Sequence, residues 1–315
     1  MHTIYRMEHM EQKILVYQTN PSLVKMWEAE ENPFKVVIAD ITHKCNMECN
    51  NCYIPNRDFP DMNTDMLVDF VKRLPNRVEL RLIGAEPTMN DDLPNLIHRL
   101  TTETAHRVIL LTNGLKLASR RYAETLRNSG LKYLYISMNG LDNDEWYEKI
   151  DGLACAKNKI KALENAVDLG FAIDIGCILV KGVNESAITN IIPMLKNAGM
   201  TNGVVRFKNV GQVGRYQLEA DQNLNIERIS KMCSDAWNID LAKIEASKNL
   251  GAGNEFETRY FSIDDSVHRG LGFWCKITDW EYISAGGVSH RRGRITENWK
   301  LAGFSEHIKA NEGGY

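Results

Sequence analysis

Six short apolar runs alternate with helical windows through two thirds of the chain, and this alternation constrains the fold more than any other feature. The runs are rich in Val, Ile, Leu and Tyr, as expected for strands covered on both faces. They span 35–41, 78–84, 107–113, 133–139, 172–180 and 203–209. The windows with helical periodicity span 64–74, 93–100, 119–130, 156–170 and 185–199. Such alternation predicts parallel βαβ units.

The regular spacing favours an α/β fold, a partial (β/α)6 TIM-like barrel, over the alternative of an open doubly wound sheet. We divide the chain into an N-terminal segment (1–34), the barrel (35–215) and a C-terminal extension (216–315). The extension begins with a helical window and is then rich in Gly and aromatic residues. No Pro- or Ser-rich linker precedes it, so we expect it to pack on the barrel and cover its mouth.

Composition narrows the class of protein. A chain of 315 residues with 43% hydrophobic content can bury a substantial core. The net charge of −3 gives no global reason to expect nucleic acid or a membrane surface as partner, although nucleic acid stays possible. No run of eighteen uncharged apolar residues is present. We therefore expect a cytoplasmic protein that does not bind membranes.

Three of the seven cysteines, Cys45, Cys49 and Cys52, are spaced C-x3-C-x2-C directly after the first predicted strand. That position is the ligand-binding end of a parallel sheet. Thiolates bind iron–sulfur clusters, which normally use four cysteines, so three would leave one iron open to a reactant. The alternatives are a structural zinc site, for which His43 is the nearest fourth ligand, and ordinary unligated cysteines.

The cysteine spacing resembles the signature of the radical S-adenosylmethionine (SAM) enzymes. The stretch GAEP at 84–87 resembles the family motif G-G-E-P at the end of the second strand. Further similar stretches follow in the same order, namely TNG (112–114), SMN (137–139), GVNE (182–185) and VRFKNVGQVG (205–214). The resemblance implies a [4Fe–4S] cluster held by the three cysteines and a SAM site lined by Tyr53, Gly84, Ala85, Glu86, Pro87, Thr112, Asn113, Ser137, Asn139, Arg206 and Val210.

Two positions depart from the family pattern. The aromatic residue that often precedes the third cysteine is Asn51 here, so Tyr53 is the substitute candidate for contact with adenine. Ala85 replaces the second glycine of the motif, and we expect its backbone carbonyl still to reach the methionine amine. We interpret Glu86 as a residue that fixes this loop.

Polar residues on two predicted strands have alternative interpretations. Ser137 and Asn139 share a face, and the alternative to lining the SAM pocket is a turn with local hydrogen bonds. Arg206 and Lys208 also share a face, where two like charges inside a barrel would need an anion such as a carboxylate of SAM or of the substrate. Alternatively, both point into the helix layer.

The resemblance further implies an activity. Reductive cleavage of SAM would give methionine and a 5′-deoxyadenosyl radical that abstracts hydrogen from a substrate C–H bond. The outcome would be epimerisation, rearrangement or another modification of a small molecule or sugar. Modification of a nucleotide, a nucleic acid or a ribosomally made peptide is the alternative. An electron donor such as flavodoxin or ferredoxin is expected. A noncatalytic iron–sulfur or zinc redox-sensing module is the alternative from another class.

The extension contains two further features. Cys275 is a candidate catalytic hydrogen-atom donor, and the alternative is a packed, inert cysteine. The surrounding cysteines of an auxiliary-cluster domain are missing. The stretch HRRGR (290–294) is expected to be a solvated basic turn, and the sharper alternative is a clamp for phosphate or a nucleic-acid backbone.

Overall fold

A computed structural model describes residues 25–50, 52, 60–210, 224–249, 256–264, 272–283 and 291–303. Six parallel strands form the centre of its sheet, and each matches a predicted run to within two residues at either end. They are β2 (Val36–Asp40), β3 (Glu79–Ile83), β4 (Arg107–Thr112), β5 (Tyr133–Ser137), β6 (Ala172–Leu179) and β7 (Asn202–Asn209). Each pairs in parallel with the next, which confirms the predicted βαβ order.

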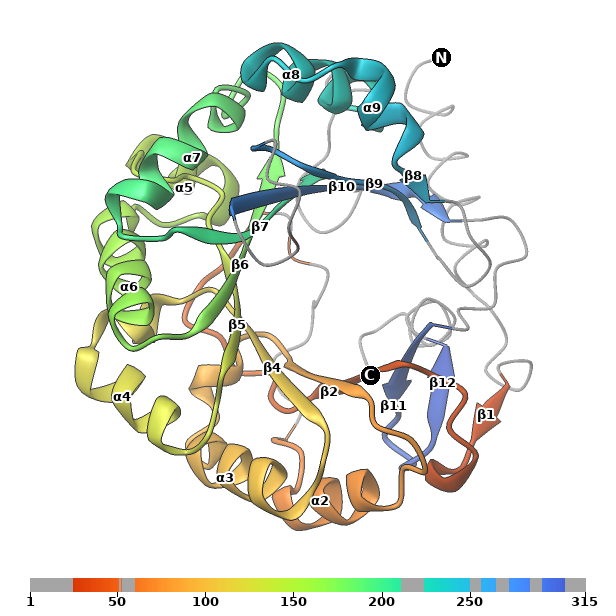
Figure 1. The fold of residues 1–315 in the computed structure, drawn as a ribbon. Coiled ribbons are helices and arrows are strands. Elements are labelled where there is room, and N and C mark those ends of the chain that lie inside the picture. Colours follow the sequence, from red (N-terminus) through yellow and green to blue (C-terminus); the bar gives the residue numbers. More distant parts are fainter. Residues whose placement is uncertain are drawn as a thin grey trace, which may run out of the picture.

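Helices connect these strands and cover the outer side of the curved sheet (Figure 1). The predicted windows correspond to α2 (Thr64–Lys72), α3 (Leu93–Glu103), α4 (Arg120–Asn128), α6 (Ala156–Asp168), α7 (Ala187–Asn197) and α8 (Ile226–Trp237). Elements that the sequence did not predict are α5 (Asp144–Asp151), α9 (Leu241–Ala246) and the 3-10 turns η2 (Ala29–Glu31), η3 (Pro87–Met89) and η4 (Leu115–Ala118). No described helix combines the length and apolarity needed to cross a bilayer.

The described strands of the extension join the sheet at both of its edges. They are β8 (Lys248–Asn249), β9 (Phe256–Ser262), β10 (Gly272–Ile283), β11 (Arg292–Ile295) and β12 (Leu301–Gly303). β10 pairs in parallel with β7, and β11 pairs in parallel with β2. With β1 (Met26–Trp27), the described order is β1-β12-β11-β2-β3-β4-β5-β6-β7-β10-β9-β8. That the extension covers the mouth of the barrel stays a prediction. It also depends on residues 265–271 and 284–290, which lie outside the described residues.

The two faces of this sheet differ in burial. Side chains directed toward the helices, such as Leu80, Leu134 and Phe207, are fully buried in one apolar core. Alternate residues on the opposite, interior face, such as Arg81 and Tyr135, are only half-buried. Because side chains alternate between faces along a strand, burial patterns such as the iBiBi of β5 show an interior that solvent enters. Most TIM barrels fill this interior with packed side chains.

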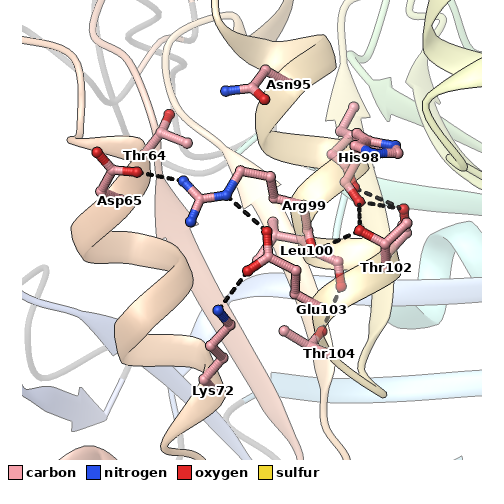
Figure 2. Close-up of polar contacts among 12 residues, drawn as sticks. Thr64, Asp65, Lys72, Asn95, His98, Arg99, Leu100, Thr102, Glu103 and Thr104 are labelled. Atoms are coloured by element: carbon pink, nitrogen blue, oxygen red, sulfur yellow. Dashed lines mark hydrogen bonds and ion pairs between the residues drawn. The ribbon is translucent and has the colours of Figure 1, made fainter.

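Ion pairs also differ in burial, because some lie on the surface and one lies inside the sheet. Figure 2 shows a network between α2 and α3, in which Arg99 contacts Asp65 and Glu103, and Lys72 contacts Glu103. These are surface pairs of small energetic value. By contrast, Arg294 of β11 donates to Asp40 of β2 at 2.5 Å with both side chains almost completely buried. The buried pair fixes the extension to the first barrel strand.

We predict that Arg294→Met lowers the free energy of unfolding by about 3 kcal/mol, because the Asp40 carboxylate would stay buried without its cation. Urea unfolding followed by circular dichroism measures the change. The control Lys72→Met, in the surface network, should unfold close to the wild-type midpoint. Equal, small effects in both variants would show that the Asp40–Arg294 pair does not anchor β11.

Candidate active site

The three motif cysteines lie on the loop that follows β2, at the carboxyl ends of the parallel strands. In the described structure none of the three forms a disulfide bond, and each is half-buried. The loop makes a tight local turn, in which the Cys52 N–H donates to the Cys49 carbonyl at 3.2 Å. The Met47 N–H also donates to the Cys45 sulfur at 3.4 Å, as expected for a sulfur that can carry negative charge. Tyr53 lies outside the described residues.

Helix α5 contacts the part of this loop that contains Glu48 and Asn50. The Asn50 N–H donates to the Ile150 carbonyl at 3.1 Å, and its side-chain amide donates to the Lys149 carbonyl at 2.9 Å. Gly152 ends the helix with φ of +72°, and a Cβ there would lie 2.8 Å from the Glu48 carbonyl oxygen. Sequence reasoning missed α5, although Asn143 at its N-cap, Asp144 and Glu145 in its first turn and Gly152 at its end were usable signals.

The GAEP motif lies directly beside the start of the cysteine loop. The Ala85 N–H donates to the Thr42 carbonyl at 2.9 Å, and the Glu86 N–H donates to the Lys44 carbonyl at 3.0 Å. Gly84 is required for this approach, because a Cβ there would lie 2.2 Å from the Thr42 oxygen. Ala85 is not among the described residues with positive φ, so alanine is accommodated without strain.

Glu86 connects the motif to the end of β4. Its buried carboxylate accepts hydrogen bonds from the Thr88 N–H (3.0 Å), the Thr88 hydroxyl (2.6 Å), the Thr112 hydroxyl (2.6 Å) and the Asn113 N–H (2.7 Å). Pro87 starts η3 and is buried. With its oxygens occupied in this way, Glu86 orders the loop, in agreement with the sequence interpretation of its role.

Asn113 and Lys159 link the strand ends to the cysteine loop. The Asn113 side-chain amide donates to the Asn46 side chain at 2.8 Å, one residue after Cys45. Lys159 of α6 is fully buried and donates to the Asn113 carbonyl (2.6 Å) and the Ser137 carbonyl (2.9 Å). Sequence reasoning missed Lys159, although its position three residues after Ala156 on the apolar stripe of the helix was a usable signal.

Ser137 and Asn139 have different surroundings. Ser137 is half-buried on the interior face at the end of β5. Asn139 is buried, donates to Asp151 at 2.8 Å and accepts from the Ile178 N–H at 2.8 Å. Asn184 of the GVNE stretch donates to the Asn139 carbonyl at 2.8 Å. These bonds match the alternative of a locally bonded turn for Asn139, and its contact with SAM stays a prediction.

Asp151, at the end of α5, is the buried carboxylate nearest to the cysteine loop. Burial raises its pKa, while Lys159, Asn139 and the Cys49 thiol act to lower it. Its Oδ2 atom accepts no hydrogen bond from the described residues. Burial, followed by Asp151 and the other two motif thiols, raises the pKa of Cys49. Metal binding would deprotonate these thiols and so act against this rise in pKa.

The remaining predicted residues are placed as follows. Arg206 lies on the interior face, where its Nε donates to Asp174 at 3.1 Å. Val210 is buried just after β7. Cys275 is fully buried on the helix-facing side of β10, where it contacts Cys233 of α8. This placement favours the packed cysteine over the hydrogen-atom donor, because Ser137 and Arg206, which are predicted to line the SAM site, lie on the other face of the sheet.

The donor set fits a cluster with an open iron position. Three cysteine side chains come from one loop, and the backbone groups of GAEP lie next to it. Among the described residues, His43 included, no three His, Cys, Asp or Glu side chains are already positioned to hold a metal ion. The ligand roles of Cys45, Cys49 and Cys52 therefore stay a prediction based on their chemistry and position.

Comparison with known proteins identifies the family. The model of the radical SAM superfamily matches residues 40–195, which contain the cysteine loop and strands β3–β6. The chain belongs to this superfamily, whose members are enzymes that use a [4Fe–4S] cluster and SAM.

Two curated relatives illustrate the range of the family. The chain is 27% identical over 209 residues to a GTP 3′,8-cyclase of Aquifex aeolicus, covering 62% of this chain and 64% of that protein. It is 29% identical over 186 residues to a 7,8-dihydro-6-hydroxymethylpterin dimethyltransferase of Methanocaldococcus jannaschii, covering 56% and 36%. The matches thus span less than two thirds of either relative.

Solved structures agree on the fold. SuiB of Streptococcus suis, bound to precursor peptide SuiA, matches with a TM-score of 0.60 and 16% identity, covering 88% of this chain and 61% of that one. Methylornithine synthase (PylB) matches with a TM-score of 0.50 and 15% identity, covering 67% of each chain. These likenesses confirm the partial TIM-like barrel.

We predict that Glu86→Gln lowers the free energy of unfolding by about 2 kcal/mol. The glutamine NH2 group would replace one of the two carboxylate oxygens. In one orientation the Asn113 N–H would lose its acceptor, and in the other the Thr112 hydroxyl would lose its acceptor. Thermal unfolding measures the loss, and Glu124→Gln, an exposed acid on α4, is the control. A wild-type midpoint for Glu86→Gln would contradict the role assigned to this carboxylate.

Proposed function

We propose that this radical SAM enzyme binds its cluster through Cys45, Cys49 and Cys52, and binds SAM between GAEP and the end of β5. The observation that supports this site is one continuous set of hydrogen bonds. It joins the cysteine loop to GAEP through Thr42 and Lys44, and to the end of β4 through Asn113.

The chain's own residues position the reactants. Ala85 would offer its backbone carbonyl to the methionine amine of SAM, and Glu86 keeps that loop rigid. Ser137 and Arg206, which share the interior face, would line the side of the site toward the substrate. Lys159 of α6 donates to the Asn113 and Ser137 carbonyls and so holds the ends of β4 and β5 together. When bound, the cluster and SAM supply the hydrogen-abstracting 5′-deoxyadenosyl radical.

We further propose that the substrate is a small molecule, a sugar derivative or a nucleotide that enters the barrel interior. The half-buried side chains of the interior face, such as Tyr135 and Ser137, support a site on that face. Curated relatives that act on GTP and on a pterin, by their names, support the same choice over a peptide. A flavodoxin- or ferredoxin-type donor would provide the electron.

Anaerobic reconstitution with iron and sulfide tests the proposal. The wild-type chain should hold about four irons and release 5′-deoxyadenosine from SAM under dithionite, because the three cysteines would leave one iron open to SAM. Cys49→Ala should lose the iron and the product, both measured on the same sample. Stoichiometric zinc without SAM cleavage in the wild type would favour the noncatalytic module.

Cys155→Ala is the matched control, because Cys155 packs in the same small apolar cluster as Cys45 and Cys49 but lies outside the motif. This variant should keep both iron and SAM cleavage. If it lost its iron as Cys49→Ala does, four cysteines would close the cluster and leave no position for SAM.

A further inference from the structure

A fully buried lysine lies beside the cysteine loop. Lys159 of α6 has no exposed surface, and its ammonium donates to the Asn113 carbonyl at 2.6 Å and to the Ser137 carbonyl at 2.9 Å. The ammonium also lies over the Tyr147 ring, 5.3 Å from its centroid. Two carbonyl oxygens and one aromatic face can engage all three of its N–H groups, so the charge is held in one place.

Two sets of contacts connect this ammonium with the motif cysteines. In the first, Asn113 accepts from the ammonium with its carbonyl and donates from its side chain to Asn46 at 2.8 Å, next to Cys45. In the second, the Tyr147 ring belongs to a small apolar cluster against which Cys45 and Cys49 pack. The ammonium therefore lies close to the place where the three thiolates would hold iron.

The charge of Lys159 acts on thiols on both sides of it. Burial is the main cause that raises the pKa of Cys49, followed by Asp151 and the other two motif thiols, whereas Lys159 acts to lower it. Burial also raises the pKa of Cys155 to about 11, although Lys159 again acts to lower it. Both effects agree with the contacts, because a buried cation stabilises negative charge on nearby sulfur.

Asp151 is a second buried ionisable group beside the cysteine loop. It accepts from the Asn139 side chain at 2.8 Å, and it follows Ile150, whose carbonyl accepts from the Asn50 N–H of the loop. Burial raises the pKa of Asp151, and Lys159 acts to lower it. Loss of the lysine charge would therefore favour proton uptake by Asp151, so a test of Lys159 has to be made without this carboxyl group.

We propose that the Lys159 ammonium raises the reduction potential of the bound [4Fe–4S] cluster and so makes the cluster easier to reduce. The proposal rests on the proposed function, since it requires the cluster at Cys45, Cys49 and Cys52. Reduction adds an electron to a group that already carries three thiolates, and a nearby cation stabilises the reduced form. Because the ammonium is buried, water and salt screen it less than they screen a surface lysine.

The same contacts also give Lys159 a structural role, which has to be separated from the electrostatic one. Asn165 of α6 provides the comparison. It is buried, and its side-chain amide donates to the Leu117 carbonyl at 2.9 Å and to the Ala118 carbonyl at 3.0 Å. Both side chains thus anchor the same helix to two backbone carbonyls, but the asparagine carries no charge.

Anaerobic redox titration of the reconstituted full chain, followed by electron paramagnetic resonance of the reduced cluster, tests the proposal. The two proteins compared are Asp151→Asn and Asp151→Asn/Lys159→Gln. The asparagine keeps an acceptor for Asn139 and cannot take up a proton. The glutamine keeps a donor for the strand carbonyls and removes the charge.

The double variant should have the lower midpoint potential. At the midpoint of Asp151→Asn, the ratio of reduced to oxidised cluster in the double variant should be about tenfold lower, which is about 59 mV for a one-electron couple. A unit charge about 10 Å from a redox centre, at an effective dielectric constant of about 20, gives a change of about this size. Equal midpoint potentials in the two proteins would overturn the proposal.

The matched control is Asn165→Ala in the same Asp151→Asn background. It should lower the melting temperature, because two buried carbonyls lose their donor, and it should leave the midpoint potential unchanged. A fall in potential as large as that caused by Lys159→Gln would contradict an electrostatic role, since a neutral anchor would then have the same effect.

Lys159→Met is the second variant, because an apolar side chain of similar length suits the buried stripe of α6. It should lower the midpoint potential as Lys159→Gln does. Circular dichroism checks the fold of each variant, and iron analysis checks its cluster. If both variants lost the fold or the cluster, the role of Lys159 would be structural and the proposal would be overturned.

These measurements separate the inference from the proposed function. If the wild type holds about four irons and cleaves SAM while the midpoint potential does not respond to Lys159, the inference fails alone. If the reconstituted wild type holds no iron–sulfur cluster, the proposed function fails and takes the inference with it. The iron content and the 5′-deoxyadenosine yield of the wild type therefore decide which of the two has failed.

Discussion

The close approach of Gly84 to Thr42 determines how the candidate site is built. Only a residue without Cβ allows the backbone after β3 to continue pairing with the backbone after β2. That pairing aligns GAEP with the loop that carries the cysteines. Glu86 then extends the same set of bonds to the end of β4, where the Thr112 hydroxyl and the Asn113 N–H donate to its carboxylate. The site thus depends on backbone hydrogen bonds between the two chain segments that continue beyond the ends of β2 and β3.

The interior of the barrel shows the opposite organisation. Helix-facing side chains are packed into one apolar core, whereas the interior face stays accessible and carries like charges close together. Burial and neighbouring cations lower the pKa of Lys208 and of Lys276 to about 7.

Sequence reasoning predicted the parallel barrel well, because strands covered by helices are continuous apolar runs whose periodicity is visible directly. It placed the cysteine loop and GAEP correctly at adjacent strand ends. It did not foresee that Lys276 and Arg292 join the sheet, because edge strands of mixed composition lack a clear period. Buried polar residues such as Lys159 and Asp151 were also missed, since their partners are distant in sequence: backbone carbonyls for Lys159 and the Asn139 side chain for Asp151.

The central claim is that three cysteines leave one cluster iron open to SAM. Electron paramagnetic resonance of the reduced, reconstituted protein, with SAM labelled by ¹⁷O in its carboxylate and ¹⁵N in its amine, tests it most directly. The account predicts that SAM changes the cluster signal and that hyperfine coupling to both labels appears. A cluster signal that SAM leaves unchanged, without coupling to either label, would contradict the account.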